Sequence, residues 1–324
     1  MCNNNLFGEG SIEGKTYKSV DKYLSQLKKE LKGSDPALIQ DALSDAEEYL
    51  SSALDTAEKE APSHEVPESL VSIMDKYGSP SEVAAAYRKI ETHLKPVFAP
   101  MTQPDPRPIL SRFFGIMGDS QAWGAFLYML LAALTGSIFG LWALFGSALS
   151  LLSMILVIGI LIAGLFLLSV RGISLIEGRI VEALLGTRMP RKPVFFRRGL
   201  GPWDKFKSLT KDPYTWKSLI YLLLMFPLGW LYFGLSGFAL AFALSFTFSP
   251  VLELVFHLPM EVYGTDAFTP VGMLPVVVLA GVLMIFLILH LAKFVGKKHG
   301  QFAKYMLVRK QPDSPEYPGG IGIK

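Results

Sequence analysis

One stretch restricts the fold of this chain more than any other: residues 121–170 contain no Asp, Glu, Lys, Arg or His. A helix needs about 20 apolar residues to cross the hydrocarbon core of a bilayer, so the stretch has room for two spans. Inside lipid, every backbone N–H and C=O group must be hydrogen-bonded within the protein, which helices and closed barrels achieve. The continuous apolar runs indicate helices.

Two more stretches, residues 218–252 and 267–292, contain no Asp, Glu, Lys or Arg. We therefore predict four spans, at about residues 122–144, 147–170, 218–248 and 269–292. The 51% of hydrophobic residues and the mean hydropathy of +0.36 agree with a membrane protein. A buried core of a soluble protein is disfavoured, because soluble helices keep a polar face. The spans lack the charged side chains that mark proton relays and ion paths, which argues against an ion-coupled transporter.

Charge divides the chain into an acidic head and a basic body. Residues 1–95 hold 11 Lys and Arg against 17 Asp and Glu, whereas the net charge of the whole chain is +3. The single cysteine, Cys2, excludes an internal disulfide, and we expect no signal peptide because no apolar run follows it. We predict a disordered start at 1–15, a cytoplasmic helical domain at 16–95, a Pro-rich linker with an interfacial helix at 96–120, a four-span domain at 121–310 and a tail at 311–324.

The head is predicted to be a small bundle of helices. Its last joint combines a glycine helix end, capping-box spacing and a proline in the first helical turn. The joint consists of Gly78, Ser79, Pro80 and Glu82. An earlier helix carries an acidic face that is either solvated or a docking surface for a basic partner. That face consists of Asp41, Asp45, Glu48 and Asp55.

Three segments of the head resemble the HAAS signalling domain. They are Tyr23-Leu24 with Leu27 and Leu31, an acidic helix ending in Glu47-Glu48-Tyr49-Leu50, and Tyr77-Gly78-Ser79-Pro80-Ser81-Glu82-Val83-Ala84. The resemblance covers residues 17–93, and it departs where the family usually has Leu in place of Tyr77. HAAS domains are typically fused to membrane spans and often encoded beside PadR-type transcription regulators. The resemblance therefore implies a signalling role, with such a regulator or another signalling protein as partner.

An internal repeat links the two halves of the apolar region. The residues Asp119, Trp123, Tyr128 and Gly136 recur with the same spacing as Asp212, Trp216, Tyr221 and Gly229. A weaker similarity follows the second span of each half, where residues 177–185 correspond to residues 299–307. Each half is predicted to contain a short entry helix, two spans and an amphipathic helix at the membrane surface. The arrangement is a parallel duplication, and Trp123 and Trp216 are expected to anchor their spans at headgroup depth.

The loops predict the orientation. The segment 171–217 and the tail after residue 292 are rich in Lys and Arg, whereas residues 249–269 contain none. By the positive-inside rule, the head, the middle loop and both termini are cytoplasmic in a multi-pass inner-membrane protein. The remaining loop is placed outside.

The second half also resembles a known family. The segments that carry this similarity are Leu184-Leu185-Gly186, Trp203-Asp204-Lys205-Phe206, Asp212-Pro213-Tyr214-Thr215-Trp216 and Phe226-Pro227-Leu228-Gly229. They are similar to the Putative sensor domain, a four-span module found ahead of histidine kinases and as stand-alone proteins in bacteria and archaea. The similarity covers residues 110–310, although Asp119-Ser120-Gln121-Ala122-Trp123 in the first half lacks the Pro and Thr. It implies sensing without naming a signal.

Sites for chemistry are scarce in this sequence. No metalloprotease, Walker, nucleophile-elbow or kinase motif occurs, so we expect no enzymatic activity, no cofactor and no direct binding of nucleic acid. The acidic loop has Glu253, His257 and Glu261 at helical spacing, followed by Asp266. These residues are either ligands of a sensed metal ion or proton, or a solvated loop whose helix Pro259 interrupts.

These features favour an all-α, non-enzymatic membrane sensor that couples a membrane or extracytoplasmic signal to a partner-binding helical head. One alternative is a carrier or membrane-enzyme subunit that handles an apolar substrate between the two transmembrane halves. Another is a lipid-interacting structural protein whose head oligomerises. Glycines in the spans allow close helix packing, within one chain or in a homodimer.

Overall fold

The computed structural model describes residues 12–60, 66–93, 108–153, 155, 159–192, 202–256 and 271–309. About 90% of these residues are helical and none is in a strand, which confirms the predicted all-α fold. The chain forms two compact units. One contains the head together with the segments 188–216 and 308–324, and the other contains residues 96–187 and 217–307.

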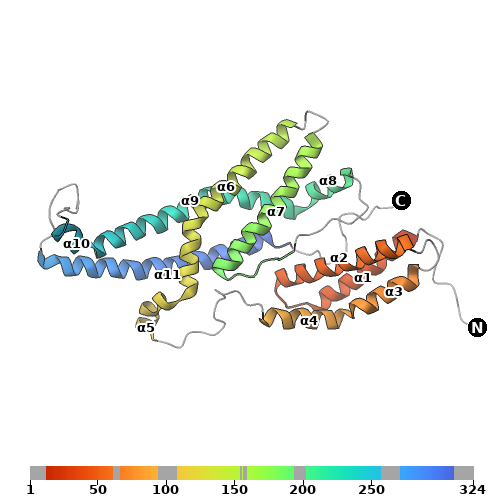
Figure 1. The fold of residues 1–324 in the computed structure, drawn as a ribbon, viewed down its shortest axis with the longest axis horizontal. Coiled ribbons are helices and arrows are strands. Elements are labelled where there is room, and N and C mark those ends of the chain that lie inside the picture. The colour runs from red at the N-terminus through yellow and green to blue at the C-terminus, as the bar shows by residue number, and fades with distance from the viewer. Residues whose placement is uncertain are drawn as a thin grey trace, which may run out of the picture. The chain divides into compact units, whose positions relative to one another are not determined.

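Four helices build the head: α1 (Ile12–Glu30), α2 (Pro36–Glu60), α3 (Val66–Tyr77) and α4 (Pro80–His93), drawn in red to orange in Figure 1. The turn before α2 is specified locally, because Gly33 adopts a positive φ of 87° and the Asp35 carboxylate accepts the Ala37 N–H at 2.9 Å. The buried core of this bundle contains Tyr23, Leu24, Leu27, Leu31, Leu38, Leu43, Leu50, Leu54 and Val83. A further short helix of this unit, α8 (Pro202–Lys211), lies in the middle segment.

The second unit begins with two short helices, α5 (Ile109–Phe114) and η1 (Gly115–Gly118). Four long helices follow: α6 (Ser120–Ser153), α7 (Gly159–Leu185), α9 (Pro213–Thr247), whose first turn belongs to the head unit, and α11 (Leu274–Leu307). Two short elements, α10 (Ser249–Leu254) and η2 (Val271–Met273), lie between the last two. All four long helices have the length and apolar composition needed to cross a membrane. They run from yellow to blue in Figure 1.

The helix ends differ from the predicted span boundaries. The turn expected at 145–146 lies inside α6, because the chain stays helical to Ser153 and Gly146 packs against the Phe166 ring. The amphipathic helices expected after each second span are the C-terminal parts of α7 and α11. Hydropathy measures the length of an apolar run, but a helix continues past that run when its next polar residues are also buried. Of the predicted disordered start at 1–15, residues 12–15 belong to α1, and the others lie outside the described residues.

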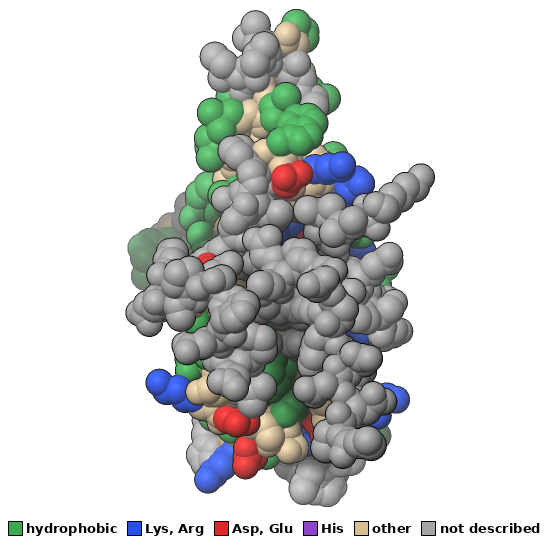
Figure 2. Space-filling view, turned by 90° about the vertical axis from the view of Figure 1, so that its right-hand side faces the viewer, with side chains coloured by type: hydrophobic (Ala, Val, Ile, Leu, Met, Phe, Trp, Pro, Cys, Tyr) green, Lys and Arg blue, Asp and Glu red, His purple; other side chains and the backbone are tan. Residues whose placement is uncertain are grey.

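The long helices expose many large hydrophobic side chains. Leu134, Phe145, Leu161, Phe238 and Leu279 are each more than half exposed. Hydrophobic side chains also remain at the surface where α6 and α7 meet, at the top of Figure 2. Continuous apolar surface on this scale requires lipid as its surroundings, so the four helices define a multi-pass membrane protein.

Candidate functional site

The residues of the predicted repeat make corresponding contacts at the start of α6 and α9. The Asp119 carboxylate accepts the Gln121 N–H at 2.9 Å, and the Asp212 carboxylate accepts the Tyr214 N–H at 3.1 Å. Each aspartate therefore caps the helix that follows it. The second carboxylate oxygen of Asp119 binds Lys293 Nζ at 2.5 Å, and that of Asp212 lies 3.5 Å from Arg309 Nη2.

Trp123 and Trp216 both hold the segment that precedes their helix. Their indole N–H groups donate to backbone carbonyls six residues earlier, Met117 at 2.9 Å and Thr210 at 2.7 Å. Both rings remain 43% and 48% exposed, respectively. Their anchoring at headgroup depth stays a prediction, and the hydrogen bonds give them a second role in fixing the entry to each span.

Gly136 and Gly229 lie where α6 and α9 cross. A Cβ on Gly136 would overlap the Met225 carbonyl oxygen, and a Cβ on Gly229 would overlap the Ala132 carbonyl oxygen. The contacts correspond, because Met225 occupies the position in the second half that Ala132 occupies in the first. Glycine is required here because two backbones meet without room for a side chain.

The two remaining repeat residues, Tyr128 and Tyr221, meet in a buried polar cluster. The Tyr128 hydroxyl donates to Glu177 Oε1 at 2.9 Å and lies 2.6 Å from His299 Nε2. The Tyr221 hydroxyl lies 3.4 Å and 3.1 Å from the same two atoms. Tyr232 adds a contact of 3.2 Å between its hydroxyl and His299 Nδ1. The cluster joins α6, α7, α9 and α11.

This cluster is sealed from solvent. Tyr221 and Glu177 are 0% exposed, Tyr128 is 1% exposed and His299 is 2% exposed. Glu177 Oε2 is buried without a hydrogen-bond partner. A buried carboxylate oxygen without a donor is costly, since it has lost its water and gained nothing in exchange. The site is therefore poised to accept one more donor or a proton.

The hydrogen-bond network also assigns the tautomer of His299. If both tyrosine hydroxyls give their protons to Glu177, then Nε2 of His299 must be the donor toward their oxygens. Nδ1 then accepts the hydroxyl proton of Tyr232. Every donor is used, while the Glu177 carboxylate has no cationic hydrogen-bond partner among the described residues.

Sequence reasoning missed the chemistry of Glu177 and His299, which it treated as parts of surface helices. It held that the spans contain no ionisable group, but the longer α7 and α11 bury Glu177 and His299, and also Arg171. The sequence did contain a clue to them, because Glu177 and His299 occupy corresponding positions in residues 177–185 and 299–307. What could not be read from the spacing is that these positions face the two repeat tyrosines.

The acidic loop does not assemble into a site among the described residues. Glu253 is 3% exposed and lies in α10, whereas His257, Glu261 and Asp266 fall outside the described residues. The described residues contain no group of three or more potential metal ligands.

The predicted joint of the head has the geometry of a capping box. Gly78 has a φ of 107°, the Ser79 N–H donates to Glu82 Oε2 at 3.0 Å, and the Glu82 N–H lies 3.4 Å from Ser79 Oγ. The Tyr23 hydroxyl donates to the Gly78 carbonyl at 2.7 Å and so ties the joint to α1. Burial raises the pKa of Tyr23 to about 12.

Replacing Glu82 with Gln should make the start of α4 less stable at neutral pH. The backbone and side-chain hydrogen bonds from Ser79 lower the pKa of Glu82 below its ordinary 4.5. A lowered pKa stabilises the fold above that ordinary value, and the gain is lost as pH falls through the folded-state pKa. Amide hydrogen exchange at residues 79–84 should be faster in the variant at pH 7, with the difference shrinking below about pH 4.5. A difference that persists unchanged at low pH would contradict the assignment.

The acidic face of α2 binds basic residues of the chain's own middle segment. Arg188 Nη2 lies 2.8 Å from Asp41 Oδ2, and Arg188 Nε lies 2.9 Å from Glu91 Oε1. Asp41 Oδ1 accepts the backbone N–H of Arg191 at 2.6 Å and of Lys192 at 3.1 Å. Burial raises the pKa of Asp41, an effect that these hydrogen bonds and Arg188 oppose. Asp41 is therefore buried and paired, whereas Glu48 is exposed.

Two more contacts hold neighbouring segments of the chain against the head. Lys192 pairs with Asp45, whose other carboxylate oxygen accepts the Tyr87 hydroxyl. The Arg309 N–H, just after α11, donates to the Gln40 side chain at 2.9 Å. The segments that follow α7 and α11 thus both bind α2.

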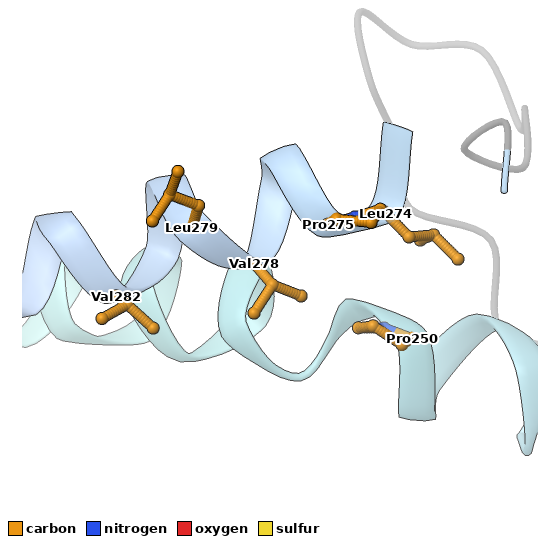
Figure 3. Close-up of a pocket in the computed structure, with 6 residues that line it drawn as sticks. All are labelled: Pro250, Leu274, Pro275, Val278, Leu279 and Val282. Carbon is orange, nitrogen blue, oxygen red and sulfur yellow. The ribbon is translucent and has the colours of Figure 1, made fainter. Parts of the chain in front are cut away.

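An apolar groove of about 500 Å³ lies between α10 and the start of α11. Its lining residues are Pro250, Leu274, Pro275, Val278, Leu279 and Val282. Figure 3 shows Pro250 opposite the labelled side chains of α11, so apolar side chains form both walls of the groove. Because all the described residues that line it are apolar, lipid chains are sufficient to fill it.

Comparison with known families agrees with this architecture. The family described as Putative sensor matches residues 128–307, more than half of the chain and including the whole polar cluster. The chain belongs to this family, and its own four candidate spans agree with a membrane protein. Neither the search of curated proteins nor that of solved structures found a match.

Proposed function

We propose that this chain is a non-enzymatic membrane sensor whose four-helix head is its output. Membership of the sensor family and the four candidate spans support the sensing role. In this proposal the protein lies in the inner membrane with both termini in the cytoplasm, as the distribution of Lys and Arg suggests. A signal acts by binding one arrangement of the spans more tightly than another.

One observation carries the coupling between spans and head. The helices that contribute Glu177 and His299 lead directly into the residues that bind α2. Arg188 follows α7 and pairs with Asp41, and Arg309 follows α11 and donates to Gln40. A shift of either helix along its axis would therefore pull on α2 through short, hydrogen-bonded connections.

The identity of the partner rests on the resemblance of residues 17–93 to the HAAS domain. That resemblance favours a PadR-type transcription regulator or another signalling protein. The exposed part of the acidic α2 face, including Glu48, remains available for a basic surface of such a partner. We propose no nucleic-acid binding by the chain itself.

A carrier or membrane-enzyme subunit is the second candidate, because Glu177 and His299 supply the ionisable groups whose apparent absence disfavoured it. Their side chains, however, bond to tyrosines of the same cluster. A transport assay in vesicles with the intact chain separates the two functions, since a sensor should not move substrate.

Hydrogen exchange in the intact, lipid-embedded chain tests the coupling. Tyr128→Phe removes one hydroxyl from the cluster, and we expect faster exchange in α2 at residues 40–45. Ser137→Ala is the matched control, because it deletes a 3.1 Å hydrogen bond from Trp230 between α6 and α9 outside the cluster. Equal exchange in α2 for both variants would refute the coupling.

Crosslinking in native membranes tests the output. The C-terminally tagged chain should capture a regulator or another signalling protein that a variant lacking residues 1–95 does not capture. If the two capture the same proteins, or only transport and lipid-synthesis proteins, the signalling role is wrong.

A further inference from the structure

The polar cluster contains two titratable groups, Glu177 and His299, and it has a place for one more proton. With Glu177 ionised and His299 neutral, the network carries a single negative charge, and Glu177 Oε2 is unpartnered. An uncompensated charge in a dry, low-dielectric interior is expensive. Adding one proton to either group makes the cluster neutral.

The groups that face this site come from every helix packed around it. They are Tyr128 from α6, Glu177 from α7, Tyr221 and Tyr232 from α9, and His299 from α11. Other charged groups lie on neighbouring turns. Arg171 and Glu182 are buried in α7, Glu182 is paired with Arg179, and Lys293 of α11 is paired with Asp119. None of these forms a hydrogen bond with Glu177 or His299.

We infer that this cluster binds a single exchangeable proton, held between Glu177 and His299 through the hydroxyls of Tyr128 and Tyr221. The tyrosine hydroxyls touch both groups, so they form a bridge that a proton can cross by reversing the direction of each hydrogen bond. A proton needs no cavity, which fits a site whose side chains contact one another directly.

The bound proton changes how α9 is held. With Glu177 ionised and the imidazole neutral, His299 Nδ1 accepts the hydroxyl proton of Tyr232, whereas an imidazolium would donate from Nδ1 and require the Tyr232 hydroxyl to turn. The corresponding position in the first half is Phe139, so this dependence exists on one side of the site alone. On the basis of the proposed function, the proton would be the signal, or part of it, that shifts the helices.

Infrared difference spectroscopy of the full chain in lipid nanodiscs, compared between neutral and acidic pH, tests the proton site directly. We expect a carboxylic acid C=O band from a dry environment, lost in Glu177→Gln and retained in Glu48→Gln, whose carboxylate is exposed. Proton uptake per chain, measured with a pH-indicator dye, should fall by one in Glu177→Gln and in His299→Gln. The double variant should lose no more than either single variant, because the two groups share one proton.

A milder variant guards against loss of folding. Tyr232→Phe leaves both titrating groups in place and should move the midpoint pH of the same band. The inference is wrong if the spectra and the proton uptake are unchanged in Glu177→Gln, His299→Gln and Tyr232→Phe. It is also wrong if the band responds to replacing sodium with choline, because that response would indicate a bound metal cation. Partner capture at the two pH values is a separate readout, so a proton site without any change in capture would contradict the role of the proton as the signal and leave the site standing.

Discussion

Arg188→Ala should destabilise the packing of the middle segment on the head by about 2–4 kcal/mol, because it leaves a buried carboxylate without its cation. The side chains of Arg188 and Asp41 are 10% and 7% exposed, and Glu91 is a second partner. The destabilisation should be smaller than the largest values for broken buried ion pairs, since Asp41 keeps the N–H donors of Arg191 and Lys192. Hydrogen exchange of α2 in the intact chain measures the change.

Lys207→Ala provides the control, because it removes one positive charge from an exposed position of the same segment. It should change exchange in α2 little. Asp41→Asn keeps the acceptor for both N–H groups, and a double-mutant cycle with Arg188→Ala should give a coupling above about 1 kcal/mol. Additive effects in the cycle would show that the pair contributes nothing beyond its separate contacts.

Gly136→Ala and Gly229→Ala should each lower the stability of the membrane unit by about 1–3 kcal/mol or more. The new methyl group would overlap a carbonyl oxygen of the facing helix, so α6 and α9 must separate. Because the two contacts correspond, the two substitutions should have similar effects. Thermal unfolding in detergent micelles measures the loss.

Gly172→Ala is the matched control for these variants. It lies inside α7 with nothing within 4 Å of the added Cβ, so it should be neutral or stabilising through its higher helix propensity. If all three substitutions have the same effect, helix propensity and not the α6–α9 contact governs stability. A Gly136→Ala chain that keeps its thermal midpoint would refute the close contact.

The head illustrates what the sequence predicts well. The helices around Leu24, Leu27 and Leu31, and the joint at Gly78 to Glu82, follow from periodicity and capping chemistry that act within a few residues. The sequence left open whether the acidic face of α2 is solvated or a docking surface. The structure shows both kinds of position on it, since Asp41 is buried against Arg188 and Glu48 is exposed. Asp41 and Glu48 are both acidic residues of the same helix, and the sequence around each does not show which one is buried.

The spans show the same division. Apolar length predicted four membrane helices, but it placed the turn of the first hairpin too early and ended the second helix of each half too soon. Gly146 resembles a turn signal, yet it is a packing position against Phe166. Propensity cannot distinguish a glycine that ends a helix from one that admits a neighbouring ring.

The sequence by itself determined the class of protein and the number of candidate spans, because apolar length and helical period are local properties. The correspondence between the two halves, read from spacing alone, stays a prediction. The tertiary structure decided which residues meet. Tyr128 and His299 are 171 positions apart and Asp41 and Arg188 are 147 apart, and each pair is joined through the packing of whole helices. The identity of a side chain limits the bonds that it can make, and the packing of the helices determines which partner lies within reach.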